Sequence, residues 1–131
     1  MTPNPTTRED APQMLVFAAE LSRLVAETTS APRAQRVLGN LSMVVQFNVS
    51  DAELASFLAV ASQQLRSARG IHPKPTVFID GEAGELVKVL QGGVDITHPL
   101  SQGKITVKGN YYHAIDLSRL ALAVRQSKSH G

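Results

Sequence analysis

The sequence predicts one α+β domain, and three stretches in its second half carry that prediction. In residues 103–110 the apolar Ile105 and Val107 alternate with lysine and threonine, which is typical of a strand with one buried face. Residues 80–93 begin with a helix-capping aspartate and end in two glycines, as helices often do. Residues 111–126 form a second amphipathic segment. Strands and helices therefore alternate along a chain of 131 residues, a length that fits one domain.

Composition indicates a globular, lightly charged protein. Hydrophobic residues make up 43% of the chain and charged residues 18%, a balance that fits neither disorder nor a highly charged surface. With four phenylalanines, two tyrosines and no tryptophan, the core must consist mainly of Leu, Val, Ile and Ala. The net charge is only +2 and the basic residues are scattered, so no nucleic-acid partner is predicted. Lys104 and Lys108 fit the solvated outer face of a strand.

The composition of the two chain ends predicts the domain boundaries, and the length of the apolar runs helps to predict the cellular compartment. Residues 1–10 are rich in proline and threonine and predict a disordered tail; residues 11–126 form the domain, and residues 127–131 a frayed end. The N-terminus lacks the pattern of a secretory signal, and no apolar run is long enough for a membrane span. There is no cysteine. These features predict a cytoplasmic protein without integral membrane association.

Two helices and a strand are predicted in the first part of the chain. The first helix is capped by Asp10 and carries Pro12 in its first turn. The second is capped by Ser30 and ends at residues 39–40. Residues 43–49 are β-branched and aromatic, which favours a strand. The apolar face of the first helix consists of Met14, Phe17, Ala18, Leu21, Leu24, Val25 and Thr28.

The second part adds a strand at residues 75–80 before the elements already described. Asp80 then caps the helix that Gly92 or Gly93 ends. A short linker follows, in which Asp95 and His98 precede a proline. The broad apolar face of the last helix consists of Ile115, Leu117, Leu120, Ala121 and Val124.

No motif for a metal, a cofactor or a catalytic group is present. The histidines at 72, 98, 113 and 130 have no metal-ligand spacing. Nucleophile elbows, P-loops and dinucleotide-binding motifs are also missing. Asp95 and His98 offer an acid–base pair, but a turn built from these residues explains them more simply. We therefore predict no catalytic residues and no cofactor.

The ordered set of short patterns resembles the sterol carrier protein type-2 family of lipid-binding domains. The patterns are VVQFNV (44–49), RGIHPKPTV (69–77), PTVFID (75–80) and GKITVKGN (103–110). The similarity extends roughly from Leu38 to Leu120. It implies a mostly antiparallel sheet of about five strands with helices packed on one face.

For residues 50–70, the local sequence pattern predicts a helix, whereas the family resemblance predicts a hairpin. Taken alone, they favour a helix, with a cap at Ser50 or Asp51 and abundant alanine. The resemblance requires two strands instead, at residues 56–61 and 64–69. We predict the hairpin, because tertiary context often overrides local propensity.

The resemblance implies a carrier of a hydrophobic ligand, such as a fatty acyl chain, a sterol or a similar lipid. Its apolar cavity would lie between sheet and helices, with Tyr111, Tyr112 and His113 at the mouth. Two alternatives remain open: a small enzyme acting on a hydrophobic intermediate through those three residues or His98, and an interaction domain with a filled core, including a homodimer. The predicted cavity residues are Phe47, Phe57, Phe78, Leu86, Val89, Leu90, Ile105, Val107, Ile115, Leu120 and Val124.

Overall fold

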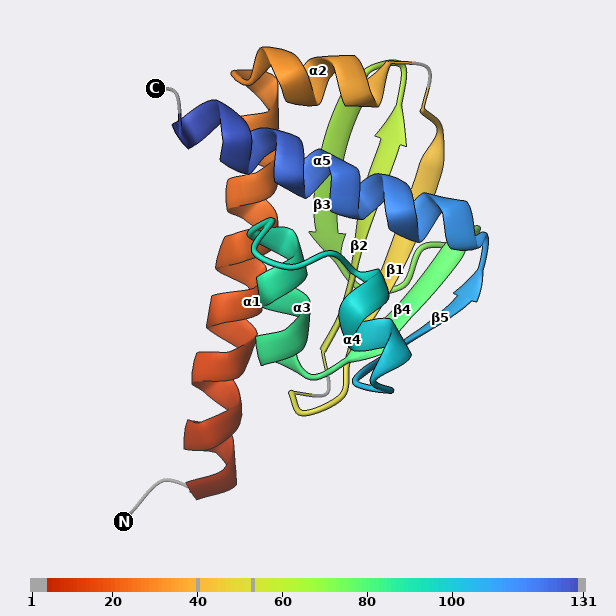
Figure 1. The fold of residues 1–131 in the computed structure, drawn as a ribbon. Coiled ribbons are helices and arrows are strands. Elements are labelled where there is room, and N and C mark those ends of the chain that lie inside the picture. The colour runs from red at the N-terminus through yellow and green to blue at the C-terminus, as the bar shows by residue number, and fades with distance from the viewer. Residues whose placement is uncertain (1–4, 40, 53, 130–131) are drawn as a thin grey trace.

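Five strands form a single sheet, and all the helices lie on one side of it (Figure 1). The computed structural model describes residues 5–39, 41–52 and 54–129. The strand order is β3-β2-β1-β4-β5; the β1–β4 pair is parallel and the other pairs are antiparallel. The predicted α+β fold with a mostly antiparallel sheet is confirmed. The strands are β1 (Met43–Val49), β2 (Leu54–Ala61), β3 (Gln64–Arg69), β4 (Val77–Gly81) and β5 (Ile105–Gly109).

The helices form the second layer of the domain. Helix α1 runs along the β3 side of the sheet and contacts α3, whereas α5 crosses the sheet and contacts α2 (Figure 1). The short α4 lies next to β5. The helices are α1 (Pro5–Thr29), α2 (Pro32–Leu38), α3 (Ala83–Leu90), α4 (Thr97–Ser101) and α5 (Tyr111–Ser129).

The hairpin predicted for residues 50–70 is confirmed. Burial in β2 alternates with a period of two, because the side chains from Leu54 to Val60 are buried at every second position. Strand β2 pairs with β1 on one side and β3 on the other, so its backbone hydrogen bonds are satisfied between strands. Ser62 and Gln63 form the two-residue turn with φ of 54° and 63°. This left-handed conformation is the one that tight hairpins require.

Alternation gives the sheet an inner face toward the helices and an outer face away from them. On the inner face, Val45 lies beside Val77 and Phe47 beside Ile79, and all four are buried. The outer face carries a row of paired positions that runs across three of the strand pairs. This row consists of Phe57, Gln46, Phe78 and Lys108.

Three helix starts differ from their predicted caps, and Asp10, the predicted cap of the first helix, lies inside α1. Ala31 rather than Ser30 occupies the cap position of α2, and its side chain makes no capping hydrogen bond. At α3 the cap position is Glu82, not Asp80. The first N–H of α3, from Ala83, is instead bound by Asp51 Oδ1 at 2.8 Å. A residue of the β1–β2 turn therefore caps a helix thirty-two positions later in the chain.

The end of α3 follows the predicted glycine pattern. Gly92 has a φ of +71°, its N–H donates to Val89 O, and the Gly93 N–H donates to Lys88 O. These two bonds satisfy carbonyl groups that a helix end leaves without partners.

The first and last helices, α1 and α5, extend beyond their predicted bounds. Helix α1 begins at Pro5, so residues 5–10 are helical and the predicted tail of residues 1–10 is too long. Pro5 itself meets the preference for proline at the first helical position that the prediction had assigned to Pro12. Helix α5 continues to Ser129, past the predicted end of the domain at residue 126. Residues 1–4 and 130–131 of the predicted ends lie outside the described residues.

Candidate functional site

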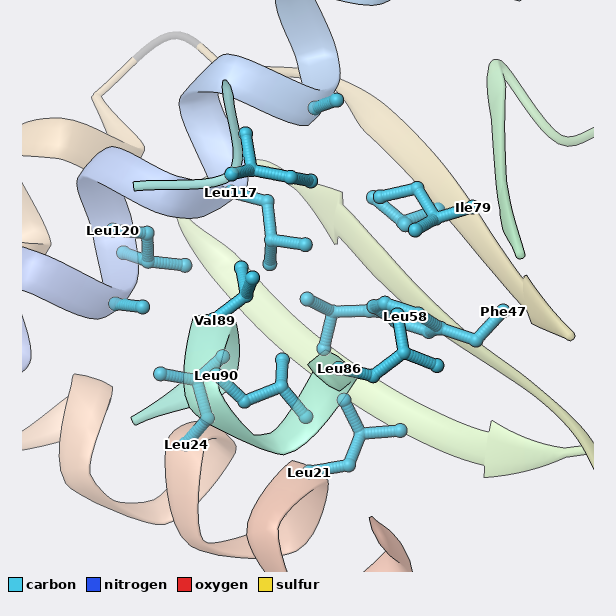
Figure 2. Packing of buried hydrophobic residues seen from close by; sticks show 14 of the residues in the cluster. Leu21, Leu24, Phe47, Leu58, Ile79, Leu86, Val89, Leu90, Leu117 and Leu120 are labelled. Carbon is cyan, nitrogen blue, oxygen red and sulfur yellow. The ribbon is translucent and has the colours of Figure 1, made fainter. Parts of the chain in front are cut away.

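The interface between the inner face of the sheet and the helices is the candidate site. Figure 2 shows α3 and α5 side chains pointing toward those of β1, β2 and β4, with α1 residues closing the same cluster. Phe17 of α1 meets Phe47 of β1 edge to face, with ring centroids 5.4 Å apart. The structure places these predicted residues in or against this cluster: Phe47, Leu86, Val89, Leu90, Ile105, Val107, Ile115, Leu120 and Val124.

Phe57 and Phe78 do not belong to this interface, so their assignment to the cavity was wrong. Each lies between two buried inner-face residues, and successive side chains of a strand point to opposite faces. Both therefore project from the outer face. The Phe57 ring meets the His72 ring there with centroids 5.0 Å apart, and Phe78 is 42% exposed.

The described side chains fill the inner interface. Leu58, Ile79 and Leu120 have 0% exposed surface, and Phe47 and Leu86 have 1%. A side chain that borders a water-sized void keeps some accessible surface on that side. These residues therefore pack against other side chains, and those with 0% exposed surface border no water-sized void.

The interface is also almost free of polar groups. The buried polar residues of the described part are Thr28, Gln46, Ser56 and Ser118, and none of them is charged. Thr28 Oγ1 donates to Leu24 O at 2.6 Å, and Ser118 Oγ accepts from Ile96 N at 3.1 Å. Among the described residues, no buried side-chain nitrogen or oxygen lacks a partner. A polar head group would therefore find its partners only at the rim.

Helix α5 covers the interface and is fixed at two points. A Cβ atom on Gly92 would lie 2.6 Å from Ala121 O, so the α3 corner approaches the α5 backbone as closely as glycine allows. Near its start, the Asn110 N–H donates to Thr76 O at 2.8 Å, and Thr76 Oγ1 lies 2.7 Å from His113 Nδ1. The start of α5 is thus joined to the segment before β4.

Tyr111, Tyr112 and His113, which were predicted at the cavity mouth, are the first three residues of α5. Asn110 Oδ1 accepts from Tyr112 N at 3.0 Å and caps the helix. Tyr111 is 44% exposed and Tyr112 77% exposed, whereas His113 is partly buried by its contact with Thr76. Phenol groups are therefore accessible at this end of the interface.

Sequence reasoning missed a strap on the outer face, formed by residues 70–76 between β3 and β4. Gln46 holds it: its Nε2 donates to Gly70 O at 3.0 Å, and its Oε1 accepts from His72 N at 2.8 Å. The sequence did carry a sign of this segment, because Gln46 lies inside the apolar run of β1 and a buried glutamine needs hydrogen-bond partners. A groove of about 450 Å³ lies beside the strap, lined in part by Val44, Ala59, Ala61, Arg66, His72 and Thr76.

Asp95 and His98 form a turn rather than an acid–base pair. Asp95 Oδ1 accepts from Thr97 N at 2.9 Å and from Thr97 Oγ1 at 2.7 Å. These bonds from the Thr97 backbone and hydroxyl hold the pKa of the Asp95 carboxyl below its usual value of 3.8. His98 contributes its backbone N–H to Asp95 O. The pair shapes the start of α4.

The sequence pattern of the SCP-2 sterol transfer family matches residues 20–121. No curated protein matches the chain. None of the described helices combines the length and the apolar character needed to cross a membrane.

Several solved structures share the fold at low sequence identity. A ubiquinone synthesis protein, UbiJ-SCP2, superposes with a TM-score of 0.67 at 16% identity, over 88% of this chain and 93% of its own. The sterol carrier protein domain 2 of Helicoverpa armigera gives 0.65 at 17% identity, over 81% and 85%. Palmitated SCP2L2 from Aedes aegypti gives 0.60 at 18% identity, over 78% and 90%. The family match covers most of the domain, and the chain therefore belongs to the SCP-2 sterol transfer family, whose general role is lipid binding and transfer.

Proposed function

We propose that this protein binds and carries a fatty acyl chain, a sterol or a similar lipid between the inner face of its sheet and its helices. The observation that carries the proposal is the continuous apolar cluster joining sheet, α1, α3 and α5 without a charged side chain. Such a wall suits an apolar ligand that needs few polar contacts. Family membership and the palmitated state of the Aedes aegypti protein support the same reading.

Ligand entry would require α5 to move away from the sheet. Its large buried side chains there are Leu117, Leu120 and Val124. Exposing three such residues costs about 5–9 kcal/mol, at about 1.5–3 kcal/mol each. An acyl chain that buries ten methylenes recovers about 8 kcal/mol. The two terms are of the same size, so a ligand can replace the contacts of α5 in a nearly balanced exchange.

The start of α5 is the proposed mouth of this site. Tyr111 and Tyr112 would supply hydroxyl groups to a ligand head group, and His113 an imidazole that now contacts Thr76. Movement of α5 would have to break the Thr76–His113 contact, which would free both groups for the ligand. The head group would then stay at the rim while the apolar part enters the interface.

Native mass spectrometry of the freshly purified protein tests the proposal directly. A co-purifying lipid of defined mass is the expected result. A fluorescent acyl probe should also bind with one-to-one stoichiometry and be displaced by palmitate, a sterol or ubiquinone. A protein that carries no lipid and binds none of these at micromolar concentration would refute the proposal.

The filled interior supports one alternative, an interaction domain that never opens. The 0% exposed surface of Leu58, Ile79 and Leu120 is the observation that favours it. In that case the acyl probe would not bind, and analytical ultracentrifugation would show a stable dimer or a complex with another protein.

A further inference from the structure

The groove beside the strap is separate from the apolar interface between sheet and helices. All the helices lie on the inner side of the sheet, so the groove on the outer side is open to solvent (Figure 1). Its volume of about 450 Å³ lies within the range of small-molecule sites, which is about 300–1,000 Å³. A ligand of this groove is therefore distinct from the lipid of the proposed carrier function.

The floor of the groove is apolar and low because its side chains are short. Ala59 of β2 is paired with Val44 of β1, and Ala61 lies two positions beyond Ala59 on the same face. On its other side, Ala59 is paired with Arg66 of β3. Because neighbouring strands lie about 4.8 Å apart, the floor from Arg66 to Val44 is about 10 Å wide. This width accommodates the flat face of an aromatic ring system.

The strap forms one wall of the groove, and hydrogen bonds to β1 hold that wall in place. Thr76 N donates to Val44 O at 2.9 Å, and Val44 N donates to Thr76 Oγ1 at 3.0 Å. The Gln46 side chain binds the other part of the strap through Gly70 O and His72 N. A wall that is already ordered loses little conformational freedom when a ligand binds, which favours affinity.

Two groups that suit an anion line the groove. Arg66 is exposed and forms no ion pair with any residue that the structure describes. His72 Nδ1 accepts from Lys74 N at 3.0 Å, so the neutral ring carries its proton on Nε2 and can donate a hydrogen bond there. No aspartate or glutamate is among the described residues that line the groove. The charge of the lining therefore favours a carboxylate over a cation.

We propose that this groove binds a small aromatic carboxylate. The ring lies on Val44, Ala59 and Ala61, and the carboxylate pairs with the Arg66 guanidinium, whose planar fork matches two carboxylate oxygens. An aromatic ring suits this floor better than a flexible chain does, because it loses no internal rotation when it binds. The proposal does not depend on the carrier function, since the groove and the apolar interface lie on opposite faces of the sheet.

NMR titration of the isotope-labelled full chain with naphthoate tests the proposal. Binding should shift the backbone amide signals of Ala59, Arg66 and His72 and leave those of Leu86 and Leu117 in the interior unchanged. The uncharged analogue naphthamide should bind about fivefold more weakly, because it cannot form an ion pair with Arg66. Arg66→Gln should lose a similar factor in affinity for naphthoate and should bind naphthamide as wild type does.

Matched variants on the same strands separate the groove from general effects. Ala59→Phe fills the floor and should abolish naphthoate binding, whereas Ala55→Phe changes the same face of β2 at a position that is not among the described lining residues. Arg69→Gln removes an exposed arginine that projects from the opposite face of β3 to Arg66. Neither Ala55→Phe nor Arg69→Gln should change the affinity for naphthoate.

Circular dichroism checks that each variant folds, and Arg66→Gln, which alters an exposed side chain, carries the test alone if Ala59→Phe does not fold. Any of the following results would overturn the proposal. They are no binding of naphthoate at millimolar concentration, shifts confined to interior residues, equal affinity for naphthoate and naphthamide, and equal losses in Arg66→Gln and Arg69→Gln.

Discussion

Replacing Leu120 with tryptophan should destabilise the protein strongly, because the side chain has no free space around it. Leu120 has 0% exposed surface and lies in the central cluster (Figure 2). Overpacking of a closed core costs about 1–3 kcal/mol. At about 2.1 cal/mol/K per residue, the unfolding entropy of 131 residues is about 0.28 kcal/mol/K. The melting temperature should therefore fall by about 4–11 °C.

The assay has a matched control on the same helix. Leu122 is 46% exposed, so Leu122→Trp should change the free energy of unfolding by no more than about 0.5 kcal/mol. The natural chain has no tryptophan, and each variant therefore carries a single fluorescent reporter. Urea denaturation can be followed by that fluorescence and by circular dichroism, with wild type measured by circular dichroism.

Equal stability of the two variants would show that Leu120 borders empty space. If Leu120→Trp also blocked acyl-probe binding at little cost in stability, the new ring would be occupying volume that the ligand normally fills. The interior would then be hollow in solution, and the reasoning from zero exposure would be wrong.

Three further changes test the local geometry. Gly92→Ala should lower the free energy of unfolding by about 1–3 kcal/mol, because alanine is strained at a φ of +71° and its Cβ would meet Ala121 O. Gly84→Ala in α3 meets no atom within 4 Å and should raise the free energy of unfolding by about 0.5–1 kcal/mol. If urea denaturation showed that both variants lose similar stability, this reasoning would be contradicted. Asp51→Ala should cost about 1 kcal/mol by removing the remote cap of α3, and Asp51→Asn much less, so equal melting temperatures for the two would argue against the cap. Because hydrogen bonds from Thr97 lower the pKa of folded Asp95, its carboxylate stabilises the fold above pH 3.8, and this contribution is lost as pH falls through the lower folded value. The difference in melting temperature between wild type and Asp95→Asn should therefore be constant near neutral pH and shrink below pH 3.8; a difference unchanged down to pH 3 would exclude this linkage.

The strands could be predicted because their signals were strong or came as an ordered set. Ile105 is buried and Lys104 and Lys108 are exposed, as alternation indicated. The hairpin of β2 and β3 depended on the resemblance, since its alanines favour a helix locally. In the sheet those same alanines lie on the outer face, and pairing with the neighbouring strands outweighs their helix propensity.

The site and its surroundings were predicted only in part, for three physical reasons. Phe57 and Phe78 were grouped with the cavity by their hydrophobicity, although the two-residue period of their strands places them on the outer face. Asp51 could not be identified as a cap of α3 from sequence, because that contact depends on the β1–β2 turn lying next to the helix start. A filled and a hollow core also have the same composition.

The single parallel pair in the sheet has a consequence for how the domain folds. Strands β1, β2 and β3 form a meander of near neighbours in sequence, and β4 and β5 form a second antiparallel unit. Only the β1–β4 ladder joins them within the sheet, and it pairs Val45 with Val77. Closing that connection, and the β4–β5 connection of similar length, carries an entropic cost that the β1–β2 and β2–β3 hairpins avoid. The meander should therefore assemble early, and docking of β4 and β5 onto it should set the folding rate.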